Sequence, residues 1–255
     1  MGEKIQNSGI QNYLSPAVEL WQEDENGLVA IAKPPGHMAH PNGADAISEK
    51  ALVPRSYDFE KEGYRLPDGR WLFLLHRLDA PTSGLMLVTL DAAVAVAVRR
   101  AFRERRCRKA YQAWVKGRAA LPALGLWRDP LAEVRTPAGL RVRPDPRGLL
   151  AETRYEEMAL ARLGEHSLRR LRLYPHTGRT HQLRVQCALR GCPVLGDKTY
   201  GDFRWNRALA GLVGRRNLFL HSERIELDYR LGGKVFHFFA EQEPPSFWDF
   251  GAAFA

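Results

Sequence analysis

The chain has 255 residues, 45% of them apolar, and its 38 lysines and arginines against 29 aspartates and glutamates leave a formal charge of +9. This apolar content supports a substantial core without metals or disulfides, and the charge favours a polyanionic partner such as a nucleic acid or an acidic membrane. A soluble basic protein without such a partner is the plainer alternative.

The cysteines and the beginning of the chain exclude several classes of protein. Cys107, Cys187 and Cys192 show no paired spacing, so we expect neither the disulfide framework of a secreted protein nor a metal site. The first 16 residues lack the layout of a signal peptide, and no apolar stretch approaches the roughly 20 residues that span a bilayer. We therefore expect a soluble, cytoplasmic protein that does not bind a membrane.

The first part of the chain predicts short strands separated by polar connections. Residues 1–17 are expected to form a flexible tail, and the apolar run at 28–32 predicts a buried strand that ends in a Lys-Pro-Pro-Gly turn. Residues 42–70 are polar and rich in turn formers, which predicts a long surface excursion before a strand at 71–75.

A third strand and a helix follow. The apolar run at 85–90 predicts the strand, and Asp91 after it is a good N-cap for a helix. Val94, Val98 and Phe102 recur every four residues, so one face of this helix should be core.

Positive charge gathers on this helix and just beyond it. Glu104 is the only acid nearby, and the basic residues are Arg99, Arg100, Arg103, Arg105, Arg106, Arg108 and Lys109. The density exceeds what pairing along a helix requires, so the cluster is either a solvated face or a track that contacts phosphates.

The next strand carries a tyrosine. Residues 109–115 alternate so that Tyr111 shares a side with Ala113 and Val115, and it should face a core or a cleft. Residues 117–139 contain several prolines and glycines, which predicts a mid-chain crossover.

The second half predicts more strands than helices. Strands are expected at 152–155 and 169–174, and a short helix at 180–190 with Thr180 as N-cap and Gly191 as its stop. The last two strands, 218–227 and 234–239, flank Gly232-Gly233, a hairpin signal. The fold class is therefore α+β with a largely antiparallel sheet.

One polar segment lies between two apolar strands. It runs His76, Arg77, Leu78, Asp79, Ala80, Pro81, Thr82, Ser83 and Gly84. This is the composition of a turn with an imidazole, a guanidinium and a carboxylate added. A structural pair of Arg77 with Asp79 in a capped loop is the alternative to a catalytic site.

A second polar segment opens the predicted helix at 180–190. Residues 176–184 read His-Thr-Gly-Arg-Thr-His-Gln-Leu-Arg and place Arg179 and His181 at the helix start. The backbone N–H groups of a helix start favour anions, so this segment alone indicates only anion binding.

Taken together, these segments resemble the RluA-type family of RNA pseudouridine synthases. The matches follow the family's order: Lys-Pro-x-Gly at 33–36, His-Arg-Leu-Asp-x-x-Thr-Ser-Gly at 76–84, Lys-x-Tyr at 109–111, Thr-Gly-Arg-Thr-His-Gln-x-Arg at 177–184 and Gly-Asp-Lys-Thr-Tyr-Gly at 196–201. The resemblance covers roughly residues 18–240.

The resemblance implies a fold and a division of the chain. The pseudouridine synthase fold is a largely antiparallel mixed sheet with flanking helices and a central active-site cleft. We expect a single catalytic domain at 18–245, between the tail at 1–17 and a C-terminal tail at 246–255.

The resemblance also implies roles for particular residues. Asp79 matches the catalytic carboxylate, Tyr111 the tyrosine that packs on the target uracil, and Arg179 the arginine that pairs with the carboxylate. Four residues are expected to bind substrate: Arg77, Thr82, His181 and Leu183. In the family, the arginine at the position of Arg77 helps to displace the target nucleotide.

The chemistry makes sense of these residue types. The bond from ribose to the uracil nitrogen breaks, the base rotates, and it rejoins through carbon. Asp79 can act as a nucleophile or remove a proton from the sugar, and the sequence leaves both routes open. Tyr111 can stack on the detached base, and its hydroxyl can take the proton lost at the new bond. We expect no cofactor and no metal.

The RNA target is a finer expectation. The Pro81-Thr82-Ser83 variant, the short stretch before the catalytic region and residues 201–207 resemble the tRNA pseudouridine synthase C branch. We expect an isomerase that acts on tRNA as a monomer without an obligatory protein partner. The alternatives are a synthase for large-subunit ribosomal RNA, a non-catalytic RNA-binding relative, and an unrelated hydrolase that uses Asp79 and His76.

Overall fold

The computed structural model describes residues 9–41, 48–117, 121–137 and 139–248, and the chain forms two compact units. Unit 1 comprises Met1–Lys109 and Ser222–Glu243, and unit 2 comprises Ala110–His221 and Pro244–Ala255. Two strands, β7 (Cys107–Lys116) and β12 (Leu220–Leu231), contain the points of division.

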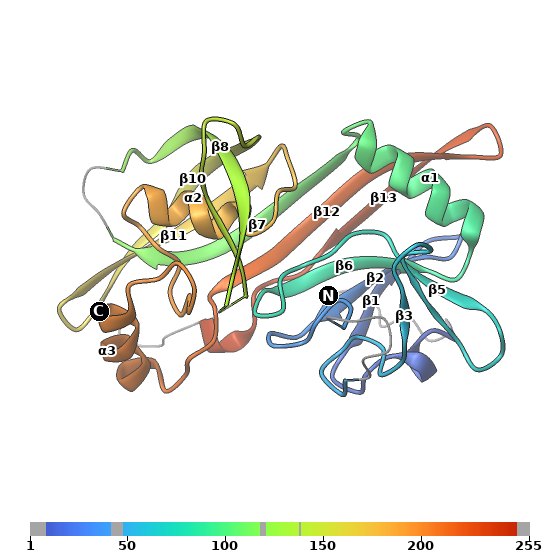
Figure 1. Ribbon diagram of the computed structural model, residues 1–255, viewed down its shortest axis with the longest axis horizontal. Helices are drawn as coiled ribbons and strands as arrows, with labels where there is room; N and C mark the ends of the chain where they lie inside the picture. The colour runs from blue at the N-terminus through green and yellow to red at the C-terminus, as the bar shows by residue number, and fades with distance from the viewer. Residues whose placement is uncertain (1–8, 42–47, 118–120, 138, 249–255) are drawn as a thin grey trace. The chain divides into compact units, whose positions relative to one another are not determined.

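Unit 1 holds strands from both ends of the chain. Its elements besides parts of β7 and β12 are η1 (Gln11–Tyr13), β1 (Glu19–Glu23), β2 (Leu28–Lys33), β3 (Tyr57–Asp58), β4 (Gly63–Arg65), β5 (Trp71–Leu74), β6 (Ser83–Thr89), α1 (Ala92–Arg103) and β13 (Lys234–Glu241). The order β3-β4-β5-β6 is antiparallel throughout, β2 pairs with both β1 and β6, and β12 pairs with β13 (Figure 1).

Helix α1 forms because its sequence supplies a cap and an apolar face. The Asp91 carboxylate accepts the N–H groups of Ala93 and Val94, at 2.7 and 2.9 Å, which satisfies two of the unpaired donors at a helix start. Val94, Val98 and Ala101 are buried in one cluster with side chains of β2, β6, β12 and β13. The helix predicted after Asp91 is confirmed.

Unit 2 is built on an antiparallel sheet in the order β7-β11-β10-β8-β9. Its elements besides β7 are β8 (Leu124–Thr136), β9 (Gly139–Pro144), β10 (Leu149–Leu163), β11 (His166–Pro175), α2 (Gln182–Leu189), α3 (Phe203–Val213) and η2 (Ser246–Trp248). Helix α2 lies over this sheet, where the Thr153 hydroxyl donates to the Gln186 side chain at 2.7 Å (Figure 1). Helix α3 buries Trp205 and Leu209 in a cluster with Trp114.

Most of the predicted strands are confirmed. The runs at 28–32, 71–75 and 85–90 correspond to β2, β5 and β6, and the strands around 152–155 and 169–174 lie within β10 and β11. The predicted hairpin is β12–β13, whose Gly232 and Gly233 have φ angles of 55° and 80°. The α+β class and the largely antiparallel sheet are confirmed.

Two predictions are wrong, and one helix was missed. The stretch 117–139 is not a crossover, because it contains the 13-residue strand β8; residues 118–120 and 138 lie outside the described part. Thr180 is not the N-cap of α2, which is His181. Helix α3 was not predicted, although Asp202 caps it with a bond from the Trp205 N–H at 3.0 Å.

The long stretch 42–70 is only partly a surface excursion. Residues 42–47 lie outside the described part, and the remainder forms β3 and β4 and buries Leu52 and Tyr64 completely. In the predicted N-terminal tail, η1 forms and Ile10 is buried, while residues 1–8 lie outside the described part. The bounds of a single catalytic domain stay a prediction. No helix in the described ranges is long and apolar enough to cross a membrane.

Candidate active site

The Asp79 segment connects β5 to β6 in unit 1. The Thr82 N–H donates to the Asp79 carbonyl at 3.0 Å, which closes a tight turn. Thr82 is buried, Asp79 is half-buried and Arg77 is exposed. The turn thus fixes the Asp79 backbone in a half-buried position.

A buried lysine anchors this turn. The Lys33 ammonium donates to three carbonyl oxygens, those of Pro34 at 3.0 Å, His37 at 2.8 Å and Ala80 at 2.9 Å. The Ala80 carbonyl also accepts the Gly36 N–H at 2.7 Å. Burial lowers the pKa of Lys33 to about 7, and the nearby Asp79 carboxylate acts in the opposite direction. Lys33 therefore ties the Lys-Pro-Pro-Gly turn to the residue that follows Asp79.

His76 serves the fold from within the same segment. Its Nε2 accepts the Leu87 N–H at 3.0 Å, so the ring hydrogen must sit on Nδ1. Burial, with the charge of Lys109 as a smaller cause, lowers the pKa of His76 to about 3. A neutral ring with one nitrogen bound to the backbone is a poor general base, which argues against the hydrolase alternative.

Gly84 closes the segment where only glycine fits. Its φ is +109°, and a Cβ there would lie 2.3 Å from the Ser222 carbonyl oxygen. This close approach of two backbones gives the final glycine of the motif a structural reason.

Tyr111 lies in unit 2, on β7, directly opposite Leu173 of β11. It is buried, 7% exposed, and β7 keeps small Ala113 on the same side of the strand. The register confirms that Tyr111 shares its side of the strand with small apolar residues.

The segment before α2 is held by a buried glutamine. The Gln182 side-chain oxygen accepts the Arg179 N–H at 3.0 Å and the Thr177 hydroxyl at 2.8 Å. The Arg179 side chain is exposed, and its Nε donates to the Leu150 carbonyl at 3.2 Å. Leu183 is only 7% exposed, so it lies on the buried face of α2.

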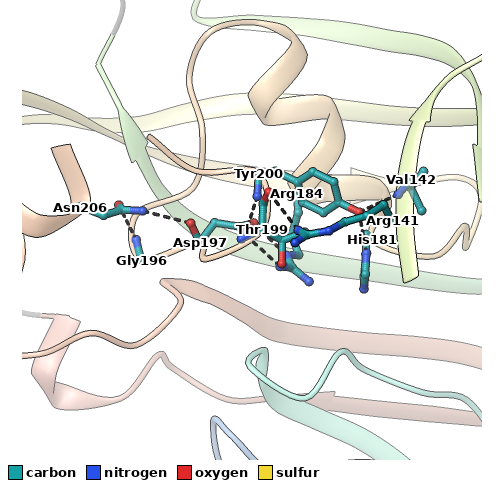
Figure 2. A network of polar contacts seen from close by, with 9 residues as sticks. All are labelled: Arg141, Val142, His181, Arg184, Gly196, Asp197, Thr199, Tyr200 and Asn206. Atoms are coloured by element: carbon teal, nitrogen blue, oxygen red, sulfur yellow. Dashed lines mark hydrogen bonds and ion pairs between the residues drawn. The ribbon is translucent and has the colours of Figure 1, made fainter. Parts of the chain in front are cut away.

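Arg184, at the end of the same motif, makes a buried ion pair. Its Nε and Nη2 donate to the two carboxylate oxygens of Asp197 at 2.8 and 2.9 Å, and the two residues are 4% and 1% exposed. Burial raises the pKa of Asp197, but the hydrogen bonds and charge of Arg184 and two backbone N–H groups outweigh it, so the pKa lies below its ordinary value. Figure 2 shows this pair within a wider polar network.

Known proteins match most of the chain. A family model described as RNA pseudouridylate synthase matches residues 27–189. The chain belongs to the RNA pseudouridylate synthase family. The enzymes of this family are isomerases that convert uridine to pseudouridine in RNA, and this chain is one of them.

Relatives within the family carry two different target names. The tRNA pseudouridine synthase C of Salmonella typhi is 34% identical over 81% of this chain and 79% of its own length. The protein of that name from Pectobacterium carotovorum is 30% identical over 89% of this chain, which spans only 60% of that relative. The ribosomal large subunit pseudouridine synthase C of Escherichia coli is 32% identical over 91% of this chain and 69% of its own length.

A solved structure supports the fold. The human RNA pseudouridylate synthase domain containing 1 superposes with a TM-score of 0.69 over 98% of this chain and 91% of its own, at 20% identity. This likeness concerns the pseudouridine synthase fold alone.

The structure divides the predicted site residues of this pseudouridine synthase between its units. Arg77, Asp79 and Thr82 lie in the β5–β6 connection of unit 1, and unit 2 holds Tyr111, Arg179, His181 and Leu183. The pairing of Asp79 with Arg179 therefore stays a prediction.

Four further residues with a role around these turns were not among the predicted site residues: Lys33, Arg184, Asp197 and Tyr200. All four lie inside the motifs quoted above, and those motifs were the signal in the sequence that could have identified them.

Several arginines of the basic cluster pair within unit 1. Arg99 forms an ion pair with Glu62 at 3.0 Å and donates to the Leu74 carbonyl at 2.9 Å. Glu104 pairs with Arg100 and Arg106, both at 2.6 Å. These interactions give part of the cluster a structural role. Fewer of its arginines are therefore candidates for contacts with RNA phosphates.

Proposed function

We propose that this pseudouridine synthase modifies a uridine of transfer RNA and that Asp79 is its catalytic carboxylate. The observation that carries the residue assignment is the construction of the β5–β6 turn. Backbone bonds and the Lys33 ammonium fix the chain at Asp79 and Ala80, and Asp79 is half-buried. A fixed backbone suits a group that must meet a substrate in one geometry.

The reaction then proceeds from the ionised carboxylate. In one route Asp79 attacks the ribose and displaces the uracil nitrogen, and the uracil carbon later displaces Asp79. In the other route Asp79 removes a sugar proton as the bond from ribose to the uracil nitrogen breaks, and it returns that proton when the carbon joins. Tyr111 stacks on the detached uracil, which keeps the base in place while it turns to present its carbon. The Tyr111 hydroxyl relays a proton: its oxygen takes the proton released when that carbon joins the ribose, while its own hydrogen passes to the uracil nitrogen that left the ribose.

Two arginines are candidates for the partner of Asp79. The motif resemblance favours Arg179, which is exposed and bound through Nε to a backbone carbonyl. Arg184 is the second candidate, because it lies in the same motif and its guanidinium is held in place by a two-bond fork with Asp197. Lysine variants of the two arginines distinguish them, because the variant of the true partner should slow the reaction by more than any loss of stability explains.

Transfer RNA is the favoured target because two of the relatives carry that name and the Pro81-Thr82-Ser83 variant resembles their branch. Ribosomal RNA is the second candidate, since the Escherichia coli relative is named for the large ribosomal subunit. We further propose a monomer that works in the cytoplasm, which suits three cysteines that form no disulfide.

The test is mass mapping of pseudouridine in RNA treated with the purified protein. Unmodified total tRNA and large-subunit rRNA are offered in parallel, and Asp79→Asn is the matched control. New pseudouridine in tRNA alone supports the proposal. Product in rRNA alone would transfer the assignment to the second candidate, and product formed equally by Asp79→Asn would remove Asp79 from the mechanism.

A further inference from the structure

Three aromatic rings of unit 1 contact one another at β3. The His40 and Tyr57 rings are stacked, with centroids 5.1 Å apart and planes at 21°. The Phe59 ring meets both of them edge to face, with its centroid 5.3 Å from that of His40 and 5.0 Å from that of Tyr57. These three residues form one aromatic cluster.

The aromatic cluster leads from the core of unit 1 to solvent. Tyr57 is buried, and its ring meets that of the fully buried Tyr64 with centroids 4.9 Å apart. His40 is half-buried, and Phe59 is 48% exposed. A single exposed apolar side chain is common, but here an exposed ring rests on two others that are packed against the core.

Hydrogen bonds fix the chain on both sides of the aromatic cluster. The Tyr64 hydroxyl donates to the Ala39 carbonyl at 2.8 Å, directly before His40. The Asp58 carboxylate accepts two backbone N–H groups of the turn that carries Phe59, each at 2.9 Å. The rings are thus held in place by the fold of unit 1, so a ligand that contacts them meets a preformed surface.

The segment that carries His40 is joined to the turn that carries Asp79. The Lys33 ammonium binds the carbonyl of His37, three residues before His40, and the carbonyl of Ala80, directly after Asp79. One buried cation therefore connects the two segments.

Positive charge lies beside the aromatic cluster. Burial, and then the charge of Glu62, raise the pKa of Tyr57 to about 12, whereas the charges of Arg99 and Arg77 act in the opposite direction. Arg77 is exposed and belongs to the β5–β6 connection, so an exposed cation of that connection is close enough to Tyr57 to act on its hydroxyl.

The reaction leaves RNA bases in need of a stacking partner. A uridine has to leave its stack to reach an active site, and its neighbours then lose one face of their own stacking. Proteins hold unpaired bases on aromatic side chains, next to positive groups that contact the backbone. The aromatic cluster with Arg77 has this composition.

We propose that Phe59, supported by His40 and Tyr57, is a stacking site for an unpaired RNA base close to the target uridine. This inference rests on the proposed function and gives a role to two residues of the polar stretch 42–70. The ligand is a base and not a phosphate, because Phe59 offers a ring and no charge.

RNA affinity is the first test, because binding requires no turnover. Phe59→Leu removes the ring and keeps an apolar side chain, and Phe59→Tyr keeps the ring. For the RNA that the wild type modifies, we expect Kd to rise about tenfold in Phe59→Leu and to stay within about twofold in Phe59→Tyr, with unchanged melting temperatures. Phe239→Leu is the matched control, since Phe239 lies on β13 of the same unit and is 44% exposed, and its Kd should not change.

Unmodified total tRNA and large-subunit rRNA are offered in parallel, which separates two kinds of failure. No product from the wild type in either RNA means that the proposed function fails, and this inference fails with it. Product from the wild type, together with equal affinities of Phe59→Leu and Phe59→Tyr, overturns the stacking site alone. A loss in Phe239→Leu as large as that in Phe59→Leu would also overturn it.

The salt dependence of binding separates stacking from charge contacts. A base that stacks on Phe59 releases no counterions, so the log–log salt slope of Phe59→Leu should equal that of the wild type. Arg77→Gln is the comparison, and its slope should fall by up to about 0.7–0.9 for one lost phosphate contact. A reduced slope in Phe59→Leu would show that the substitution disturbs phosphate contacts, which contradicts the proposal.

The stacked base is located with stem–loops that carry 2-aminopurine, a fluorescent base that stacking quenches, at each position around the mapped uridine. We expect one position to be quenched on binding to the wild type and to Phe59→Tyr, and to stay bright with Phe59→Leu. Fluorescence that is the same for the wild type and Phe59→Leu at every position would refute the stacking site.

Discussion

Two turns of this protein each carry an aspartate, and the two are built in opposite ways. In unit 2, Asp197 is buried and uses both carboxylate oxygens on Arg184 and on two backbone N–H groups. In unit 1, Asp79 is half-buried, and its turn is held through backbone atoms, above all the Ala80 carbonyl that binds Lys33 and Gly36. These contacts therefore tie the carboxylate itself to the fold at Asp197 and the backbone of the turn at Asp79.

The largest expected effect on activity comes from Asp79→Asn. The amide has the same shape but can neither attack the ribose nor accept its proton, so pseudouridine formation should fall more than 100-fold. RNA affinity should stay within a few-fold and the melting temperature should not change. Activity above about 1% of wild type, measured by product mapping, would refute the proposal that Asp79 is the catalytic carboxylate.

The matching substitution in unit 2 is Asp197→Asn. It leaves the Arg184 guanidinium buried without its charge partner, so we expect a loss of about 3–5 kcal/mol in unfolding free energy. The folded pKa of Asp197 is lowered, so the stability it contributes is present above its unfolded pKa of about 3.8 and is lost as the pH falls through the folded pKa. Urea titrations between pH 7 and pH 3 should show the wild type and variant converging, and a constant gap would contradict this role of Asp197.

The two candidate arginines also differ in burial, because Arg184 lies in a buried ion pair and Arg179 is exposed. Arg179→Lys should lower the rate constant about tenfold without changing stability, because one ammonium cannot reproduce a forked contact with Asp79. Arg184→Lys should lower the melting temperature as well, since it removes one of two bonds to Asp197. Single-turnover rates and thermal melts are the measurements. An unchanged rate in Arg179→Lys would reduce its role to the hydrogen bond with the Leu150 carbonyl and favour Arg184.

The role of Lys33 has a pH signature. Its folded pKa of about 7 lies below its unfolded value near 10.5, so the cost of burying the ammonium is fully present below pH 7 and is relieved as the pH rises toward 10.5. Wild-type stability relative to Lys33→Met should therefore rise between pH 7 and 10, by at most about 1.4 kcal/mol per pH unit. Denaturant titrations check it, and a difference that stays constant over this range would show that the three carbonyl bonds keep the ammonium charged.

The smallest expected effects concern the basic cluster of unit 1. Arg103→Gln with Arg105→Gln should weaken RNA binding evenly across sequences and reduce its log–log salt slope by up to about 0.7–0.9 for each phosphate that the protein no longer binds. Arg99→Gln with Arg106→Gln is the matched pair, and it should lower stability because these side chains bind Glu62 and Glu104. If the first pair leaves both affinity and slope unchanged, the RNA crosses another basic surface.

Several features of this protein could be predicted because their signals are local in the sequence. A cap residue followed by apolar residues four apart specified α1, and two glycines between apolar runs specified the β12–β13 hairpin. The Asp79 and Tyr111 segments were visible because short motifs carry their own order and spacing.

Other features depend on partners that are remote in sequence, so they appear only in the folded chain. Strand β8 was missed because Gly125 and Pro130 interrupt it and because Leu124 and Leu126 lie exposed beside buried Trp127, so its alternation is hidden. Pairing with β10, 25 residues or so along the chain, supplies the hydrogen bonds that make it a strand. Helix α3 is likewise stabilised by packing against Trp114 and Phe219.

The difference between the two aspartates also depends on partners that are remote in sequence. Asp79 and Asp197 both sit in polar motifs, and the composition of those motifs alone does not show which carboxylate a buried ion pair engages. Burial and the choice of partner do so, since Asp197 reaches Arg184 across 13 residues and Lys33 reaches Ala80 across 47. Hydrogen bonds and desolvation act through space, so the roles of these residues emerge only when the chain has folded.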